Sequence, residues 1–503
     1  MGGWFLTVAL ASAASRPEVS VGERLFSDVR FARPLVSEAG DGTRRQPTSC
    51  RTCHFTEGST GTFGDRAPRS LLPARDDGRS TTPRNSPALV DALLEAQPAP
   101  LLHYDGEFAT ATELVSETFL GRNFGWLPGE RDAARQHFAR VIREDGGAKP
   151  SAPAGAPLPL AVLLRGSDPA IPAAWRLPAA LRVDPDRATD EEILRGCAEL
   201  VVAFMQSLTF SRDATGAHDG SPYDAFLAAN RLPRMPRNGE TPPEYARRLR
   251  ELAAALRVPR FVDEPARRLR QHDQPFRFGE AEFEGMKIFF REAVGSAQRS
   301  GAGNCAECHV PPLFTDLKFH NTGVAQDDYD GVHGSGAFAA LRVPSLAERT
   351  AEPRRWLPPT PQHPDAAGPW LSIPSRERPG HTDLGLWNIY GNPDFPAPQA
   401  GIARLLDATG RSTADAVLAK SLARFKTATT RDLGHSAPYL HTGHLRTVRE
   451  VVEFYRRMSA LAGEGKLRNA PPEFFAMRLG EPDIDPLTAF LCALNEDYEW
   501  TGG

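Results

Sequence analysis

A five-residue pattern, Cys-x-x-Cys-His, occurs twice in this chain of 503 residues, at residues 50–54 and again at residues 305–309. Two thiols at this spacing can bond to the two vinyl groups of a haem, and the histidine that follows them then lies under the iron as its ligand. The doubled pattern therefore predicts two covalently attached haem c groups. The residues that would hold them are Cys50, Cys53, His54, Cys305, Cys308 and His309.

Two other kinds of site use cysteine pairs. The pairs of a structural zinc site usually lie about 15–20 residues apart, whereas these two lie in opposite halves of the chain. A thioredoxin-type pair would not account for a histidine directly after both pairs. The remaining cysteines, Cys197 and Cys492, lie in apolar stretches with helical periodicity and fit small buried side chains. Whether these two form a disulfide stays open.

The elements that must position these residues are predicted to be helices. Apolar residues recur three to four positions apart in several stretches, whereas strand-like alternation is confined to short pieces. We therefore expect a mostly α-helical fold. The stretches with helical periodicity are residues 110–120, 131–144, 190–210, 244–257 and 279–293, with a shorter helix expected at residues 21–31.

Each half of the chain repeats one order of features: a helix that ends near phenylalanine, a loop, the cysteine motif, and a closing apolar helix that carries one cysteine. This weak duplication predicts an N-terminal haem domain at residues 16–215 and a C-terminal haem domain at residues 276–503. Residues 216–275 are expected to form a connector or insertion between them.

Composition restricts the classes of protein that fit. Hydrophobic residues make up 41% and charged residues 24%, and the net charge of −4 does not suggest a nucleic-acid binder. Residues 1–15 are apolar and small, which is typical of a secretory signal peptide, although no Lys or Arg precedes the apolar run; a mis-assigned start is the alternative. The signal-like start predicts an exported, periplasmic protein. No stretch reaches 18 apolar residues, so we expect no membrane span.

With these residues in place, the chain resembles the bacterial di-haem cytochrome c peroxidase family, which includes the MauG enzymes. The resemblance is carried by both motifs and by residues 83–92, 103–108, 308–323 and 425–455. It implies two cytochrome-c-like α-domains packed together, with long loops and insertions. The stretches at 148–189, 211–275 and 350–415 are the ones that look like insertions.

The resemblance also implies roles for single residues. His54 and His309 match the proximal ligands of the two haems, and the first haem would be the one that reacts with peroxide. Tyr104 stands where the family has a tryptophan that passes electrons between the haems. Tyr455 matches the sixth ligand of the second haem, which is Met in the peroxidases and Tyr in the MauG enzymes. Met458, three residues further on, is the competing ligand.

A calcium ion between the two domains is a further expectation from the resemblance. The family's ligands match the side chain of Asn85 and the backbone carbonyls of Ser436 and Pro438. Oxygen ligands of this kind suit calcium. A turn-capping role is the alternative for the asparagine.

The acid–base residues of the peroxide site are where this chain departs from the family. Leu114 and Phe124 stand at the positions of the family's Gln and Glu, and no histidine that could block the first haem occurs between Phe55 and Leu102. The first haem is therefore expected to be five-coordinate and open. The candidate replacements for the missing pair are Glu113, Arg122 and Asn123.

The expected function is reduction of hydrogen peroxide at the first haem, with the second haem storing oxidising equivalents. Electrons would come from a small cytochrome c or copper protein, or from a side chain of a partner protein as in MauG. An electron-transfer cytochrome without peroxidase activity is the alternative from another class. Such a carrier should have two six-coordinate irons.

Overall fold

The computed structural model of the chain describes residues 16–33, 35–36, 44–45, 48–54, 84–93, 100–145, 158–293, 295 and 298–501. The expected signal peptide at residues 1–15 lies outside this part of the chain. Most of the loop between Phe55 and Leu102 does too, so the coordination of the first haem is a prediction that the described residues do not address. Among the described helices, none is long and apolar enough to cross a membrane.

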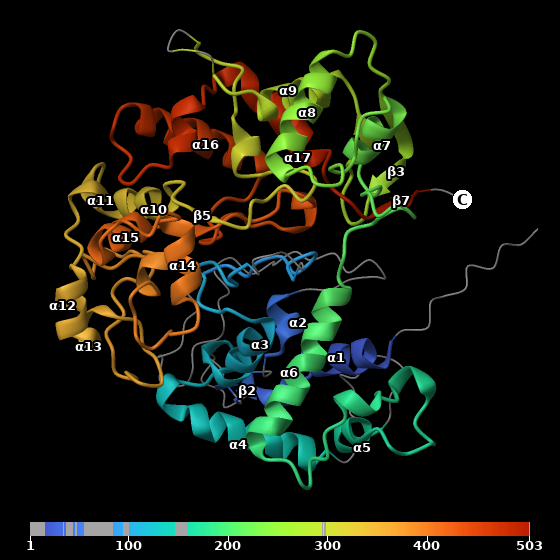
Figure 1. Cartoon of the computed structure of the whole chain (residues 1–503), viewed down its shortest axis with the longest axis vertical. Coiled ribbons are helices and arrows are strands. Elements are labelled where there is room, and N and C mark those ends of the chain that lie inside the picture. The colour runs from blue at the N-terminus through green and yellow to red at the C-terminus, as the bar shows by residue number, and fades with distance from the viewer. Residues whose placement is uncertain are drawn as a thin grey trace, which may run out of the picture.

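The first group of helices surrounds the first motif and lies at one end of the molecule (Figure 1). Helix α6 packs against α1, α3 and α4 and buries Phe26, Phe119 and Phe138 in one apolar core. The three long helices predicted in this half are present. The elements are α1 (Pro17–Ser27), β1 (Leu35–Val36), β2 (Arg44–Arg45), α2 (Cys50–Cys53), α3 (Ala111–Leu120), α4 (Arg131–Arg143), α5 (Leu160–Arg165) and α6 (Asp190–Ser207).

The second group lies at the other end and surrounds the second motif (Figure 1). Helix α9 packs against α17 and α8, and a three-stranded antiparallel sheet, in the order β4-β3-β7, is part of the same group. The elements are α7 (Pro222–Ala229), α8 (Pro242–Ala254), β3 (Val262–Leu269), β4 (Pro275–Phe278), α9 (Glu280–Phe290), α16 (Val448–Gly463), α17 (Ile484–Cys492) and β7 (Tyr498–Trp500).

Much of the expected connector, residues 216–275, is packed in this second core. Tyr223, Phe226 and Tyr245 are buried against α9 and α17. The connecting segment between the two groups of helices is therefore shorter than the predicted residues 216–275, because it consists of the segment between α6 and α7.

A third group of short helices lies along one side of the molecule (Figure 1). It includes the predicted insertion at residues 350–415 and packs around Trp370 and Trp387, with Tyr104 of the first domain against the same cluster. The elements are β5 (Phe319–His320), α10 (Val324–His333), α11 (Ala337–Ala340), α12 (Leu346–Ala351), α13 (Pro353–Trp356), α14 (Gln399–Leu406), α15 (Ala414–Ser421) and β6 (Phe425–Lys426).

The weak internal duplication is visible in two helix crossings. A Cβ atom on Gly22 of α1 would collide with the carbonyl of Leu200 on α6, and one on Gly285 of α9 would collide with the carbonyl of Pro486 on α17. Each domain thus needs a glycine where the helix before its motif crosses the closing helix. Cys197 on α6 and Cys492 on α17 are free thiols. The prediction of a mostly α-helical fold is confirmed.

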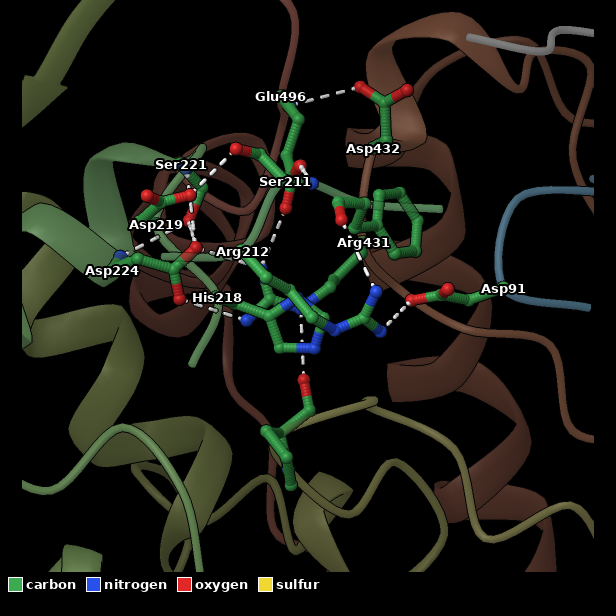
Figure 2. A network of polar contacts seen from close by, with 12 residues as sticks. Asp91, Ser211, Arg212, His218, Asp219, Ser221, Asp224, Arg431, Asp432 and Glu496 are labelled. Carbon is green, nitrogen blue, oxygen red and sulfur yellow. Dashed lines mark hydrogen bonds and ion pairs between the residues drawn. The ribbon is translucent and has the colours of Figure 1, made fainter. Parts of the chain in front are cut away.

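A buried ion network joins the segment between α6 and α7 to the second domain (Figure 2). The guanidinium of Arg431 donates to both carboxylate oxygens of Asp224 at 2.9 Å and to Glu496 at 3.0 Å. The backbone N–H of Ser211 donates to the other oxygen of Glu496 at 2.9 Å. One buried cation therefore serves two buried carboxyl groups.

The burial of Glu496 makes stability depend on pH. Burial, only partly offset by Arg431, raises the pKa of Glu496 from its ordinary value of 4.5 to about 8. Between these values the folded chain holds a proton that the unfolded chain has lost, so stability falls as pH rises, by at most about 1.4 kcal/mol per pH unit. Urea unfolding at pH 5.5 and 8.5 should show this loss, and Glu496→Gln should remove its contribution. The exposed Glu464→Gln is the control; an equal slope in both variants would contradict the assignment.

Candidate haem-binding sites

The first motif forms one short helical turn. Cys50–Cys53 make up α2, and the backbone N–H of Ser49 donates to the hydroxyl of Thr52 at 3.1 Å, which fixes the start of the turn. Burial lowers the pKa of His54 to about 4, and its ring is hydrogen-bonded to the backbone of Pro87. Because proline has no N–H, the ring must donate to the carbonyl. The imidazole is thus neutral, with its other nitrogen available to a metal.

The second motif has the same arrangement. Cys305 begins a 3₁₀ turn, and Nδ1 of His309 lies 3.1 Å from the carbonyl oxygen of Phe314. Burial lowers the pKa of His309 and raises the pKa of the Cys305 thiol to about 12. A histidine that donates one ring nitrogen to a carbonyl has its tautomer and orientation fixed for metal binding by the other nitrogen. The residues at both motifs therefore fit a haem.

Tyr455 lies on the side of α16 that faces the second motif. Burial raises its pKa, as does negative charge on the Cys308 and Cys305 sulfurs, whereas a hydrogen bond with the side chain of Thr322 lowers it. Met458 on the same helix is buried in an apolar cluster beneath Gly323. Tyr455 is only partly buried and packs against the same cluster, so the ligand assignment stays a prediction.

Tyr104 lies where the two domains meet. Its carbonyl accepts a hydrogen bond from the backbone N–H of Lys426 in β6 at 2.8 Å, and its ring centroid is 6.2 Å from that of His441. The His441 ring stacks on Phe425 with 3.5 Å between centroids. His103, the preceding residue, contributes to lowering the pKa of His54, so the electrostatic influence of this segment reaches the first motif.

Arg122 and Asn123 lie beside the first motif, in a 3₁₀ turn that follows α3. Thr48 lies two residues before Cys50, and its hydroxyl donates to the carbonyl of Asn123 at 3.0 Å. Nε of Arg122 and Oδ1 of Asn123 are buried and have no hydrogen-bond partner within the described part of the chain. Both side chains therefore have polar atoms available to a bound molecule.

Glu113 is less well placed. It lies in the first turn of α3, near Glu117, which is paired with Arg131 at 2.5 and 2.7 Å. No hydrogen bond from its carboxylate to a described residue of the first motif is found. Phe124, at the family's Glu position, is buried in the first core.

The structure shows a cluster of charged residues beside Tyr104 that was not predicted from the sequence. Nδ1 of His103 is 3.1 Å from Glu107 and 3.7 Å from Asp105. Burial alone would lower the pKa of His103, but hydrogen bonds to the two carboxylates raise it to about 9. The imidazole is therefore charged at neutral pH. The alternation His-x-Asp-x-Glu at residues 103–107 is the sequence signal that could have revealed this cluster.

Arg84 connects that cluster to the third group of helices. Its guanidinium lies between Asp105, at 2.5 Å, and Asp383, at 2.6 and 2.9 Å, and all three side chains are buried. Asp383 belongs to the predicted insertion at residues 350–415. The insertion thus supplies a buried counter-charge to the first domain, and no sequence pattern around Asp383 indicated this contact.

The expected calcium ligands are partly brought together. The side-chain amide of Asn85 donates to the carbonyl of Pro438 at 2.6 Å, and its Oδ1 is buried without a hydrogen-bond partner among the described residues. The hydroxyl of Ser436, two residues away, donates to the carbonyl of Asp432 at 3.1 Å. The amide nitrogen of Asn85 faces the Pro438 carbonyl, so the two oxygens could bind one calcium ion only with the amide group turned over. The ion stays a prediction.

Comparison with known proteins adds to this geometry. No family model matches the chain. It is 26% identical over 203 residues to cytochrome-c peroxidase IdrP2 of Pseudomonas sp. (strain SCT), and 26% identical over 214 residues to cytochrome-c peroxidase IdrP1 of Denitromonas iodatirespirans. Over these residues the chain is similar to proteins named cytochrome-c peroxidase. Each match spans 40% of this chain and only 39% of the relative.

Two solved structures are similar at lower identity. The di-haem peroxidase BthA from Burkholderia thailandensis E264 is 16% identical, with a TM-score of 0.46 over 96% of this chain and 87% of that one. A MauG-like protein associated with microbial copper homeostasis is 16% identical, with a TM-score of 0.47 over 98% of this chain and 96% of that one.

Proposed function

We propose that the chain is a periplasmic di-haem c-type peroxidase that takes hydrogen peroxide at the first motif and shares oxidising equivalents with the second. The observation that carries the proposal is the matched pair of motif histidines. His54 and His309 are both half-buried and neutral, and each ring is hydrogen-bonded to a backbone carbonyl, that of Pro87 for His54 and that of Phe314 for His309. A bound haem would supply the electron transfer; the protein supplies orientation and proton control.

The residues around the first motif have separate tasks in this proposal. Arg122 and Asn123 bind and polarise peroxide through the polar atoms that have no other partner. The charged His103 with Glu107 provides a group that can move a proton between the two peroxide oxygens. Tyr104, which joins the two domains, passes electrons between the motifs. This assignment replaces the family's Gln and Glu with side chains from other positions.

The second motif is proposed to hold oxidising equivalents rather than to receive electrons first. Tyr455, whose phenol is acted on by the charges of Cys308 and Cys305, would give the iron an oxygen ligand, which favours its oxidised form. This observation also favours the second candidate function, oxidation of a side chain of a partner protein as MauG enzymes perform. A small cytochrome c or copper protein is the donor in the first case, and the partner protein is the donor in the second.

The test is to add one equivalent of hydrogen peroxide to the fully ferric, haem-loaded protein and to record optical and near-infrared spectra. We expect a rapid change in the bands of both haems without added reductant, because the first site is open. A response only after one electron has been supplied would indicate a reductively activated peroxidase. No response in either state would leave the electron carrier as the function.

The proposed calcium ion predicts a second result. Metal analysis of the purified protein should find one calcium per chain, and Asn85→Ala should reduce it to trace amounts because the only side-chain ligand is lost. Asn230→Ala is a matched control, since Asn230 also donates to a backbone carbonyl, at 2.9 Å, but lies far from the domain junction. An equal calcium content in both variants would contradict the site.

A further inference from the structure

We propose that Arg431 is a positioning residue for the second haem, because it fixes the loop that orients His309. The segment between α6 and α7 fixes Arg431 through Glu496. This inference rests on the proposed haem at Cys305 and Cys308. It gives the network of Figure 2 a role in tuning that haem in addition to its role in packing.

The first step is the contact between Arg431 and the loop after the second motif. Nε of Arg431 donates to the carbonyl of Pro312 at 2.9 Å, and its guanidinium lies 5.5 Å from the ring centroid of Phe314. The carbonyl of Phe314 is the partner of Nδ1 of His309. Phe314 has a φ of 54°, a left-handed conformation that a bulky residue adopts only when its surroundings hold it there. Arg431 is the charged part of those surroundings.

The second step is the way Arg431 is itself fixed. Its side chain is 1% exposed, and it is bound by both oxygens of Asp224 and one oxygen of Glu496 while Nε binds Pro312. A planar guanidinium can satisfy these acceptors together, whereas the single ammonium of lysine cannot. The position of the Pro312 carbonyl therefore depends on an arginine.

The third step leads to the first domain. Ser211, whose N–H binds Glu496, is followed by Arg212, whose guanidinium pairs with Asp91 at 2.5 Å. The N–H of Asp91 donates to the carbonyl of Leu208 at the end of α6. Asp91 lies in the segment whose apolar residues pack in the first core. A continuous set of polar contacts thus runs from the first domain to the loop that orients His309.

The expected effect follows from the hydrogen bond at Nδ1. A firm bond to the Phe314 carbonyl makes the imidazole a stronger donor to iron, which stabilises the oxidised form. In Arg431→Lys the loop loses its Nε contact, so the bond weakens. The reduction potential of the second haem should shift to a more positive value, and its low-spin electron paramagnetic resonance signal should change. The high-spin signal of the first haem should stay as in the wild type.

The experiment uses the haem-loaded full-length chain. Haem content by mass spectrometry comes first, because a wild-type chain without haem at the second motif would refute the proposed function on its own. Redox titration and paramagnetic resonance then compare the wild type with Arg431→Lys and with Arg449→Lys, a control that makes the same replacement in an exposed ion pair with Asp485. An Arg431→Lys protein that is less stable but keeps the wild-type potential and signal would overturn the proposal.

If Arg431→Lys does not fold, Glu496→Gln tests whether the network around Arg431 tunes the second haem. The carboxyl of Glu496 faces Arg431, Asp224 and Asp432. Its ionisation above pH 8 adds a negative charge beside Arg431, so the potential of the second haem should fall between pH 7 and pH 9 further in the wild type than in Glu496→Gln. Identical pH dependence in the two proteins would overturn the proposal.

Discussion

Replacing Tyr455 with phenylalanine is expected to remove the low-spin signal of the second haem and to raise its reduction potential by a few tenths of a volt, within the range of about 0.8 V that axial ligands span. The Tyr455 ring packs against Phe474, with 6.0 Å between centroids, and the charges of Cys308 and Cys305 act on its phenol. A phenolate is a hard anionic ligand that favours ferric iron, so its loss should destabilise the oxidised state. Redox titration and paramagnetic resonance of the purified variant measure both effects.

Two control variants test whether Tyr455 is a haem ligand or only a packing residue. Tyr439→Phe removes a hydroxyl that donates to the carbonyl of Leu433 at 2.7 Å and should leave the haem signals unchanged. Met458→Leu keeps the apolar volume in its cluster and should also leave them unchanged. If Met458→Leu altered the signal and Tyr455→Phe did not, the ligand would be Met458.

Replacing Arg84 with methionine is expected to destabilise the protein by about 3–5 kcal/mol. The change leaves the carboxylates of Asp105 and Asp383 buried without the guanidinium that now pairs with both, at 2.5 and 2.6 Å. Urea unfolding of the haem-loaded protein measures the loss. We also expect weaker attachment of the third group of helices to the first domain, since Asp383 belongs to that group.

Neutralising the whole cluster provides the control. In Arg84→Met with Asp105→Asn and Asp383→Asn no unpaired buried charge remains, so most of the lost stability should return. Arg342→Ala, which removes an exposed ion pair with Glu348, should cost less than about 1 kcal/mol. A loss of similar size in Arg84→Met and Arg342→Ala would show that the buried cluster contributes no more than a surface pair.

Local patterns were sufficient for much of the fold. The periodicity of residues 110–120, 131–144 and 190–210 predicted α3, α4 and α6, because the spacing of apolar residues in a helix reports directly on its buried face. The repeated order of helix, motif and closing helix predicted two domains, and Gly22 and Gly285 now show matching helix crossings. The two motifs were recognised from spacing alone.

Predictions that needed long-range contacts were less complete. Residues 216–275 were predicted to form a connector or insertion with one amphipathic helix at 244–257, yet Tyr223 and Tyr245 are buried in the second core. The contact between Arg84 and Asp383 joins segments that are distant in sequence, so no local pattern carries it. The cluster at residues 103–107 was within reach of sequence reasoning and was missed.

The sequence by itself determined where haem can attach, since Cys-x-x-Cys-His brings both thiols and the histidine together within one turn of chain. Only the tertiary structure decided which side chains surround each motif. Tyr455 and Met458 are three residues apart on one amphipathic helix, so periodicity cannot distinguish them; in the fold Met458 is buried in an apolar cluster and Tyr455 packs against the same cluster, where the charges of Cys308 and Cys305 act on its phenol. The orientation of His309 likewise depends on Arg431, because its buried guanidinium binds acceptors that are distant in sequence, the Pro312 carbonyl and the carboxyl groups of Asp224 and Glu496.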